Sequence, residues 1–140
     1  MTQPSPRRAR KTSATKVPAS RPRLPRAVQL AVDAALGKKG LEVLILDLRK
    51  SDAFTDFFVI ATGANSRQVQ AIADGVEMAL KGAGVRPSNV EGSKRAEWVL
   101  LDYFDFVVHV FSPAARTFYG LERLWATARR ISFDDTPAGP

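Results

Sequence analysis

The sequence predicts an α/β protein with some α+β character: a single compact domain in which a mixed sheet of about five strands packs against helices. Three observations support this fold class. Segments with apolar residues at helical spacing alternate with short apolar runs of strand length. The helical segments carry recognisable caps, and residues 98–111 form two apolar runs around a polar hinge, which is the pattern of a β-hairpin. A chain of 140 residues has room for one such domain.

A basic tail precedes the predicted domain. Residues 1–26 contain eight of the 21 basic residues, five of the nine prolines and no acidic residue, so we expect them to be disordered. The domain itself, residues 27–134, is then close to neutral, and the formal charge of +7 belongs to the tail. Residues 135–140 are rich in turn formers and are expected to be disordered as well.

The first half of the domain reads as a helix followed by two strands. A helix is expected first, because apolar residues recur at helical spacing: Val28, Ala31, Val32, Ala35 and Leu36. The glycines at positions 37 and 40 are expected to end it. Residues 41–48 and 56–62 are apolar at nearly every position, which is typical of strands covered on both faces. Residues 49–55 are long enough to connect these strands as antiparallel neighbours.

The second helix has the clearest signals. Asn65 or Ser66 is placed as its cap, and Gln68 is placed to complete a capping box on Asn65. Its apolar stripe consists of Val69, Ile72, Ala73, Val76 and Leu80. Residues 81–84 contain two glycines and end the helix.

The second half of the domain reads as three strands and a last helix. Residues 87–91 predict a short strand, and residues 98–103 and 106–111 predict the hairpin. Ser112 and Pro113 predict a helix start, since serine caps and proline fits the first turn. We expect Phe118, Leu121 and Trp125 on the inner face of this helix.

The first strand of the hairpin has two distinct faces. Side chains alternate along a strand, so Trp98, Leu100 and Asp102 share one face. Val99, Leu101 and Tyr103 share the other. A large indole beside a carboxylate is typical of an interface, whereas a tryptophan that fills the core is equally compatible with this pattern.

Four segments in order carry a resemblance to a known family. They are DFFVIATG at 56–63, SRQVQAIAD at 66–74, WVLLDYFDFVVHVF at 98–111 and FYGLERLW at 118–125. Together they resemble the ribosomal silencing factor family, also called the Iojap-like family. One departure is Phe104, where many members have glycine in the turn.

The resemblance implies a function in translation. It implies a homodimeric α/β domain that binds the large ribosomal subunit through ribosomal protein L-fourteen and sterically blocks subunit joining, which represses translation. The partner-binding residues it implies lie in and around the hairpin: Trp98, Leu100, Leu101, Asp102, Tyr103, Glu91 and Asp105. Trp98 would be the anchor, and the carboxylates would complement basic residues of the ribosomal protein.

Two other functions remain as alternatives. One is a nucleotidyltransferase-like enzyme, because the fold of the family resembles the fold of nucleotidyltransferases. Such enzymes place a serine after glycine at a strand end and two carboxylates soon after, to hold two metal ions. Here Gly63 is followed by alanine, and the next acid is Asp74. The other alternative is an RNA-binding protein that acts through weak contacts of its basic tail with ribosomal RNA phosphates.

The sequence predicts no enzyme, no cofactor and no metal site. Asp47, Asp52 and Asp56 are expected to cap turns or lie at the sheet rim rather than to bind a cation. His109, the only histidine, is expected in the core or at its rim with one ring nitrogen hydrogen-bonded. The absence of cysteine excludes thiol chemistry and disulfides.

The chain also lacks an apolar run of the ~20 residues that a membrane span needs. It lacks the apolar segment of a secretory signal as well. We expect a bacterial cytoplasmic protein, with an organelle as the alternative location.

Overall fold

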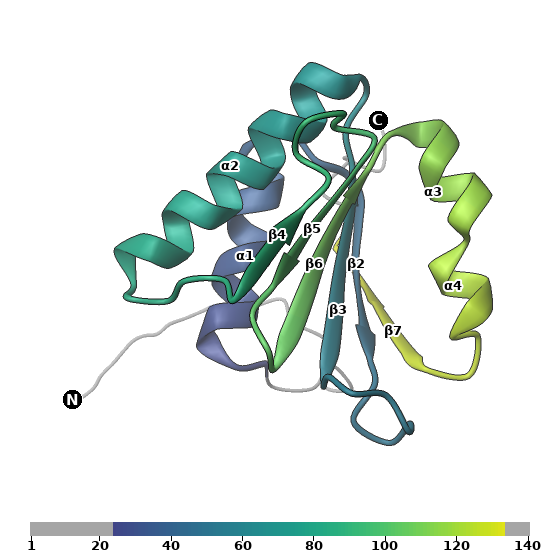
Figure 1. Cartoon of the computed structure of the whole chain (residues 1–140). Helices are drawn as coiled ribbons and strands as arrows, with labels where there is room; N and C mark the ends of the chain where they lie inside the picture. Colours follow the sequence, from purple (N-terminus) through teal and green to yellow (C-terminus); the bar gives the residue numbers. More distant parts are fainter. Residues whose placement is uncertain (1–23, 134–140) are drawn as a thin grey trace.

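The structure is a computed structural model that describes residues 24–133 (Figure 1). Most of the predicted tail and the predicted C-terminal segment, residues 135–140, lie outside the described residues. The last three residues assigned to the tail belong to the fold. Helix α1 begins at Arg26, and Leu24 packs against the core.

A six-stranded mixed sheet forms the centre of the domain, where about five strands were expected. Its order is β4-β5-β6-β3-β2-β7, and its strands are β2 (Leu41–Asp47), β3 (Phe57–Thr62), β4 (Asn89–Glu91), β5 (Trp98–Asp102), β6 (Phe106–Phe111) and β7 (Arg129–Ser132). The predicted hairpin is present as the antiparallel pair β5 and β6, and β2 and β3 are antiparallel neighbours as predicted. Only β3 and β6, at the middle of the sheet, run parallel.

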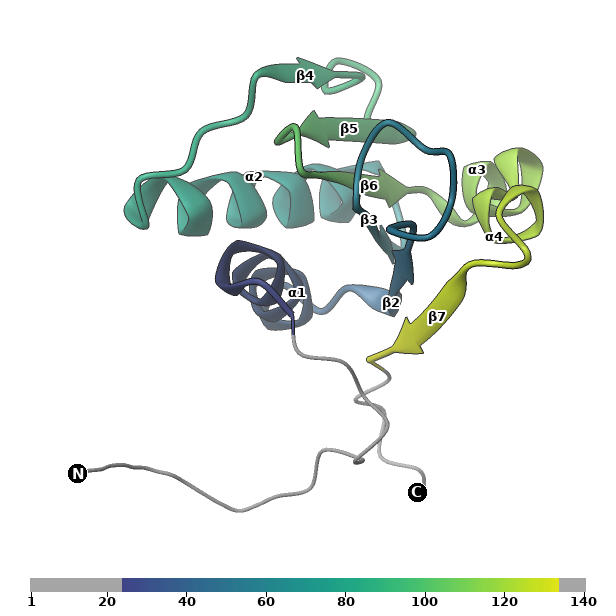
Figure 2. The same cartoon turned by 90° about the horizontal axis from the view of Figure 1, so that it is seen from below.

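Helices α1 (Arg26–Gly37) and α2 (Ser66–Gly82) lie together on one face of the sheet (Figures 1 and 2). The cap of α2 is as predicted: the Asn65 side chain accepts a hydrogen bond from the Gln68 N–H at 2.9 Å. The predicted box on Asn65 closes one residue earlier: the Gln68 side chain accepts from the Ala64 N–H, and it also donates to the carbonyl oxygen of Lys39. One glutamine therefore fixes the start of α2 and links it to the chain that leaves α1.

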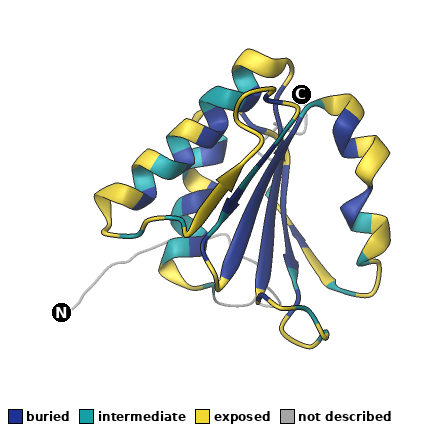
Figure 3. Cartoon of the chain, viewed as in Figure 1, coloured by how far each residue is buried: buried dark blue, intermediate teal, exposed yellow. Residues whose placement is uncertain are grey.

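The main core lies between these two helices and the sheet, and both sides of the central strands are buried (Figure 3). On the α1 and α2 side the buried set includes all five predicted apolar residues of α2. From the sheet it takes alternate residues, among them Val43, Ile45, Val59, Val99 and Val108. The intervening residues point to the opposite side of the sheet, which has its own, smaller cluster.

The opposite side of the sheet carries α3 (Pro113–Tyr119) and α4 (Leu121–Leu124). Ser112 caps α3 as predicted, by accepting a hydrogen bond from the Ala115 N–H at 3.2 Å. The single helix that the sequence predicted is interrupted at Gly120, which has a left-handed backbone with φ of 54°. The interruption turns the helical face, so Leu121 is buried but Phe118 is exposed, against the prediction.

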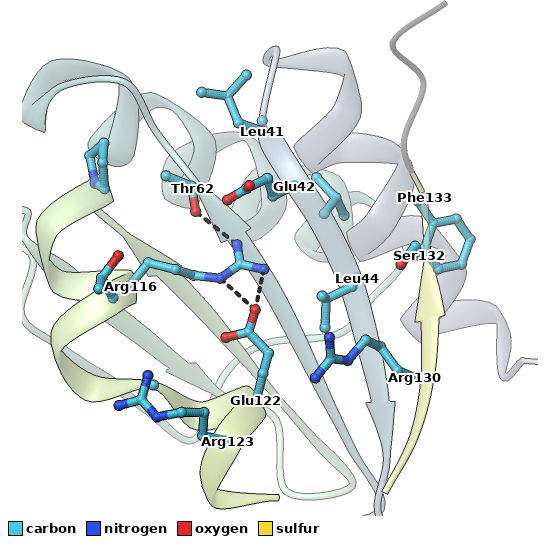
Figure 4. A pocket seen from close by; sticks show the side chains of 15 residues that line it. Leu41, Glu42, Leu44, Thr62, Arg116, Glu122, Arg123, Arg130, Ser132 and Phe133 are labelled. Carbon is cyan, nitrogen blue, oxygen red and sulfur yellow. Dashed lines mark hydrogen bonds and ion pairs between the residues drawn. The ribbon is translucent and has the colours of Figure 1, made fainter. Parts of the chain in front are cut away.

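Arg116 of α3 is nearly buried, and its guanidinium joins α3 to both α4 and the sheet (Figure 4). The Arg116 guanidinium donates to the Glu122 carboxylate at 2.8 Å and to the Thr62 hydroxyl at 2.7 Å. Burial would raise the pKa of Glu122, but the hydrogen bond and charge of Arg116 outweigh it, and the pKa is lowered. Because Thr62 ends β3, this bond ties α3 to the middle of the sheet.

Candidate docking face

One side of the β4 and β5 edge brings four of the predicted site residues together. The burial of β5 alternates, with Trp98, Leu100 and Asp102 half-buried and the residues between them buried. In the neighbouring edge strand Glu91 pairs with Leu100. Since directly opposed residues in an antiparallel pair share a face, these four side chains form one surface. We call it the docking face: Glu91, Trp98, Leu100 and Asp102.

Trp98 is held in place by three neighbours. Its indole N–H donates a hydrogen bond to Nδ1 of His109 at 3.1 Å. Its ring centroid lies 4.3 Å from that of Tyr119 and 5.1 Å from that of Phe111. The side chain is neither a fully buried core residue nor a mobile surface residue. It is a half-buried aromatic ring with a fixed orientation.

His109 is a core histidine with one ring nitrogen hydrogen-bonded, as predicted. Its side chain is 4 % exposed, and burial lowers its pKa to about 3. The ring is therefore neutral at pH 7. Because Nδ1 accepts from the indole of Trp98, the ring proton is on Nε2, which has no hydrogen-bond partner within residues 24–133. The nearest ring is that of Phe58, at 4.5 Å between centroids and nearly perpendicular.

Leu101 and Tyr103 do not belong to this surface, although they were predicted as partner-binding residues. Leu101 is 1 % exposed, and Tyr103 is buried in the main core, where its ring stacks on Phe106. Burial raises the pKa of Tyr103 to about 12, with a smaller contribution from the charge of Glu77. The strand period of two places them on the α2 side, so their side chains stabilise the fold.

The three acidic residues predicted to complement a basic partner lie at one edge of the domain. Glu91 is exposed and accepts a hydrogen bond from the Asn89 side chain at 2.6 Å. Asp102 is half-buried, and one of its carboxylate oxygens accepts from the Phe104 N–H at 2.8 Å. Asp105 is exposed in the β5–β6 turn. All three are accessible to a partner, and Asp102 also supports the turn.

Tyr119 is a neighbour of the docking face that the sequence did not single out. It packs against Trp98, and Phe118 packs edge-on against Tyr119 at 4.9 Å between centroids. The signal in the sequence was Gly120, whose left-handed conformation ends α3 directly after this aromatic pair. An aromatic surface thus continues from β5 onto α3.

The strand end that a nucleotidyltransferase would use is closely packed here. A Cβ atom at Gly63 would lie 2.6 Å from the backbone nitrogen of Val69, so the glycine is needed for the approach of α2 to β3. Asp74 is exposed and accepts a hydrogen bond from Gln70. Asp47 is paired with Arg49 at 2.8 Å, which lowers the pKa of its carboxyl mainly through that hydrogen bond.

Neither metal ligands nor a deep cavity is found in the described part of the chain. Residues 24–133 contain no group of three or more His, Cys, Asp or Glu side chains placed to hold a metal ion. An open groove of about 1030 Å³ lies between the α3–α4 segment and strands β2 and β7 (Figure 4). Its charged lining mixes both signs, with Arg116, Arg123 and Arg130 beside Glu42 and Glu122.

The fold and this face define a class of protein. A half-buried tryptophan held on a rigid sheet, next to leucine and rimmed by carboxylates, has the composition of a protein-binding surface. The domain is therefore a small α/β protein with one partly covered sheet face of this composition.

The chain belongs to the ribosomal silencing factor family. The sequence profile of that family, described as ribosomal silencing factor during starvation, matches residues 21–139. The resemblance seen in the four sequence segments is thereby confirmed.

Relatives named "Ribosomal silencing factor RsfS" agree with this assignment. The one from Chromobacterium violaceum is 42% identical over 97 residues, which cover 69% of this chain and 80% of the relative. The one from Halalkalibacterium halodurans is 38% identical over 107 residues, which cover 76% of this chain and 92% of the relative. A chloroplastic Iojap protein of Arabidopsis thaliana is 37% identical, covering 78% of this chain and 46% of the relative.

Solved structures of the same fold come from two of these lineages. The crystal structure of a Chromobacterium violaceum protein has a TM-score of 0.69 at 41% identity and covers 71% of this chain and 83% of that one. A Bacillus halodurans crystal structure has a TM-score of 0.64 at 42% identity and covers 70% and 91%. The predicted α/β fold class is confirmed. Within residues 24–133 no helix combines the length and apolar character needed to cross a membrane.

Proposed function

We propose that this protein represses translation by binding ribosomal protein L-fourteen on the large ribosomal subunit and sterically blocking subunit joining. Membership of the family implies a ribosome as its partner. The observation that carries the finer proposal is Trp98, a half-buried indole held by His109 and Tyr119 at the end of the docking face that adjoins α3. The mechanism is occlusion and needs no chemical step.

A fixed tryptophan suits the role of anchor. Ordering a side chain on binding costs about 0.5 to 1.5 kcal/mol when the side chain is mobile beforehand. The hydrogen bond to His109 and the packing on Tyr119 remove most of this cost before the partner arrives. Leu100 beside the indole supplies apolar surface that excludes water around it.

The carboxylates around the face support a basic partner. Glu91 and Asp105 are exposed, and Asp102 at the end of β5 is half-buried. Such charges at the rim of an interface raise the association rate and oppose binding to nucleic-acid phosphates. This favours a basic ribosomal protein over ribosomal RNA as the direct contact of this face.

Neither alternative function is favoured by the described residues. An enzyme that transfers nucleotides needs carboxylates next to the Gly63 turn, and the first acid after it, Asp74, is exposed on α2. We therefore propose a non-enzymatic protein without a cofactor. The proposed RNA contact of the basic tail concerns residues outside the described part of the chain. Deleting residues 1–23 tests it, and we expect ribosome binding to weaken several-fold at most.

The decisive experiment is a binding and subunit-joining assay with matched variants. Trp98→Ala is expected to weaken binding to L-fourteen about 30-fold or more and to relieve the block of subunit joining. Met78→Ala is the control. Met78 is a large, exposed apolar residue of α2, which lies on the other side of the sheet from the docking face. Equal behaviour of the two variants would contradict the proposal. Incubation with nucleoside triphosphates and magnesium, followed by product analysis, tests the enzymatic alternative.

Two further properties belong to the proposal. We propose that the protein is a homodimer in the absence of ribosomes, which sedimentation of the purified chain would test. We also propose a bacterial cytoplasmic location, in line with its bacterial relatives, while the chloroplastic Iojap proteins keep an organelle as the alternative. Fractionation of the source cells would decide between them.

A further inference from the structure

Two loops meet at one end of the sheet, next to the docking face (Figures 1 and 2). One connects β2 to β3 and the other connects β5 to β6. The Thr55 hydroxyl donates to the carbonyl oxygen of Phe104 at 2.9 Å, and the Asp56 N–H donates to the carbonyl oxygen of Asp105 at 2.9 Å. The two loops therefore form one continuous surface.

Each of these joined loops exposes a phenylalanine. Phe54 is 77% exposed and Phe104 is 76% exposed. A single exposed apolar residue needs no explanation, since such residues are common on soluble proteins. Two phenylalanines on loops that are hydrogen-bonded to each other are different, because both rings are presented at the same end of the molecule.

Phe104 occupies a position that disfavours phenylalanine. Its φ is +74°, and the N–H of Asp105 donates to the carbonyl oxygen of Tyr103 across it at 2.9 Å. This combination is a γ-turn of the rare, strained hand, in which glycine fits without penalty. The strain is not offset by burial of the ring. An exposed bulky residue at a strained turn is a pattern found at functional sites.

The charges around the two rings are mainly negative. Asp52, Asp56 and Asp105 are exposed, and Asp102 at the end of β5 is half-buried. Within residues 47–56 and 102–106, Arg49 is paired with Asp47, and Lys50 is the remaining cation. Such a surface repels RNA phosphates and attracts lysine and arginine side chains.

We infer that Phe54 and Phe104, together called the phenylalanine tip, are a second docking point that inserts into a basic, apolar-lined protein surface of the large ribosomal subunit. The tip adjoins the docking face through Asp102, which accepts the Phe104 N–H. The choice of partner rests on the proposed function. The requirement for a basic protein surface follows from the carboxylates alone.

The test separates binding from stability at Phe104. Phe104→Gly relieves the left-handed strain, so its melting temperature is expected to stay equal or rise, while its affinity for purified large subunits falls about tenfold. Phe54→Ser is expected to bind about tenfold more weakly with unchanged melting. Met78→Ser, a change of an equally exposed apolar residue on α2, is the control and is expected to bind like the parent protein.

The same panel distinguishes the failure of this inference from that of the proposed function. Full affinity of both tip variants for large subunits, with loss of L-fourteen binding by Trp98→Ala, would overturn the tip and leave the proposed function intact. Loss of large-subunit binding by the tip variants, with no binding of L-fourteen by the parent protein, would support the tip and overturn the proposed partner. Reversing the charge with Asp105→Lys should weaken binding further, and an unchanged or higher affinity would contradict a basic partner surface.

Discussion

The two sides of the sheet are covered to different degrees. Helices α1 and α2 cover one side of the sheet except at its edge strand β4, whereas the short α3–α4 segment covers the other side only in part (Figures 1 and 3). Strand β5 contributes to both: Val99 and Leu101 enter the closed core, and Trp98 and Leu100 remain half-buried. The difference teaches that a single strand can divide its residues between a closed core and an accessible surface.

The largest effect is expected from the closed side. Leu101→Ala should lower the free energy of unfolding by about 3 kcal/mol, because it leaves a cavity in a packed core. Urea denaturation measures this loss, and Leu100→Ala is the matched control one residue away. We expect the control to lose about 1 kcal/mol or less of stability and to bind L-fourteen more weakly. Similar stability losses in both variants would break the distinction between the two sides.

The next effect is expected at Trp98 itself. Trp98→Ala should reduce affinity for L-fourteen by about 2 kcal/mol, the threshold of an interface hot spot. Because the indole also packs on Phe111 and Tyr119, the variant should lose about 1 to 2 kcal/mol of stability as well. Thermal melting and binding measured on the same preparations separate the two losses. A variant that unfolds outright would make Trp98 a residue of the core.

Acid should lower the free energy of unfolding through His109, which lies on the partly covered side of the sheet. Its folded pKa of about 3 lies below the unfolded value of 6.5, so the unfolded chain binds the proton more readily. The stability that neutral His109 contributes is complete above pH 6.5 and is lost as the pH falls from there towards 3. The slope is at most about 1.4 kcal/mol per pH unit. Denaturation of the parent protein and His109→Phe between pH 7 and 4.5 should show a flatter dependence for the variant.

Alkali should also lower the free energy of unfolding, through Tyr103 on the α1–α2 side of the sheet. Its folded pKa of about 12 lies above the ordinary tyrosine pKa of 10.0, so the buried phenol resists ionisation. Its contribution is complete below pH 10 and is lost as the pH rises from there towards 12. Tyr103→Phe should remove this loss, which denaturation at pH 9 and 11 would show. An equal loss in the variant would assign the alkaline sensitivity to other groups.

The smallest effect is expected from the rim charges. Glu91→Gln should slow association with L-fourteen a few-fold at low salt and leave the dissociation rate nearly unchanged. Asp74→Asn on α2 is the control, since its carboxylate is exposed on the closed side of the molecule. Stopped-flow measurements at two salt concentrations make the comparison. A slower dissociation of Glu91→Gln, with Asp74→Asn unchanged, would show that the Glu91 charge opposes the complex.

Local signals made most of the fold predictable. The caps at Asn65 and Ser112 act within a few residues, and the alternation in β5 is read directly from its sequence. The alternation also defined the face of Trp98 correctly. The family signature covers the whole strand and therefore predicts Leu101 and Tyr103 at the interface as well, whereas the period of two places both side chains in the core.

Features that depend on distant contacts were not predictable. Strand β7 shows only one buried residue in four, and it is defined by pairing with β2, far away in the chain. The break at Gly120 depends on a backbone conformation that a helical pattern does not reveal, so the pattern predicts Phe118 on the inner face although its side chain is exposed. Tyr119 next to Trp98 follows from the same break and was missed for the same reason.

The parallel pairing of β3 with β6 has a consequence for the kinetics of folding. The pairs β2–β3 and β5–β6 are each joined by a short connection, whereas β3 and β6 are separated by α2, β4 and β5. Short connections close quickly, and contacts between segments far apart in the chain form slowly. The domain is therefore expected to assemble from two early hairpins whose alignment along the central parallel pair limits the folding rate. A newly made chain then completes its docking face only after that alignment.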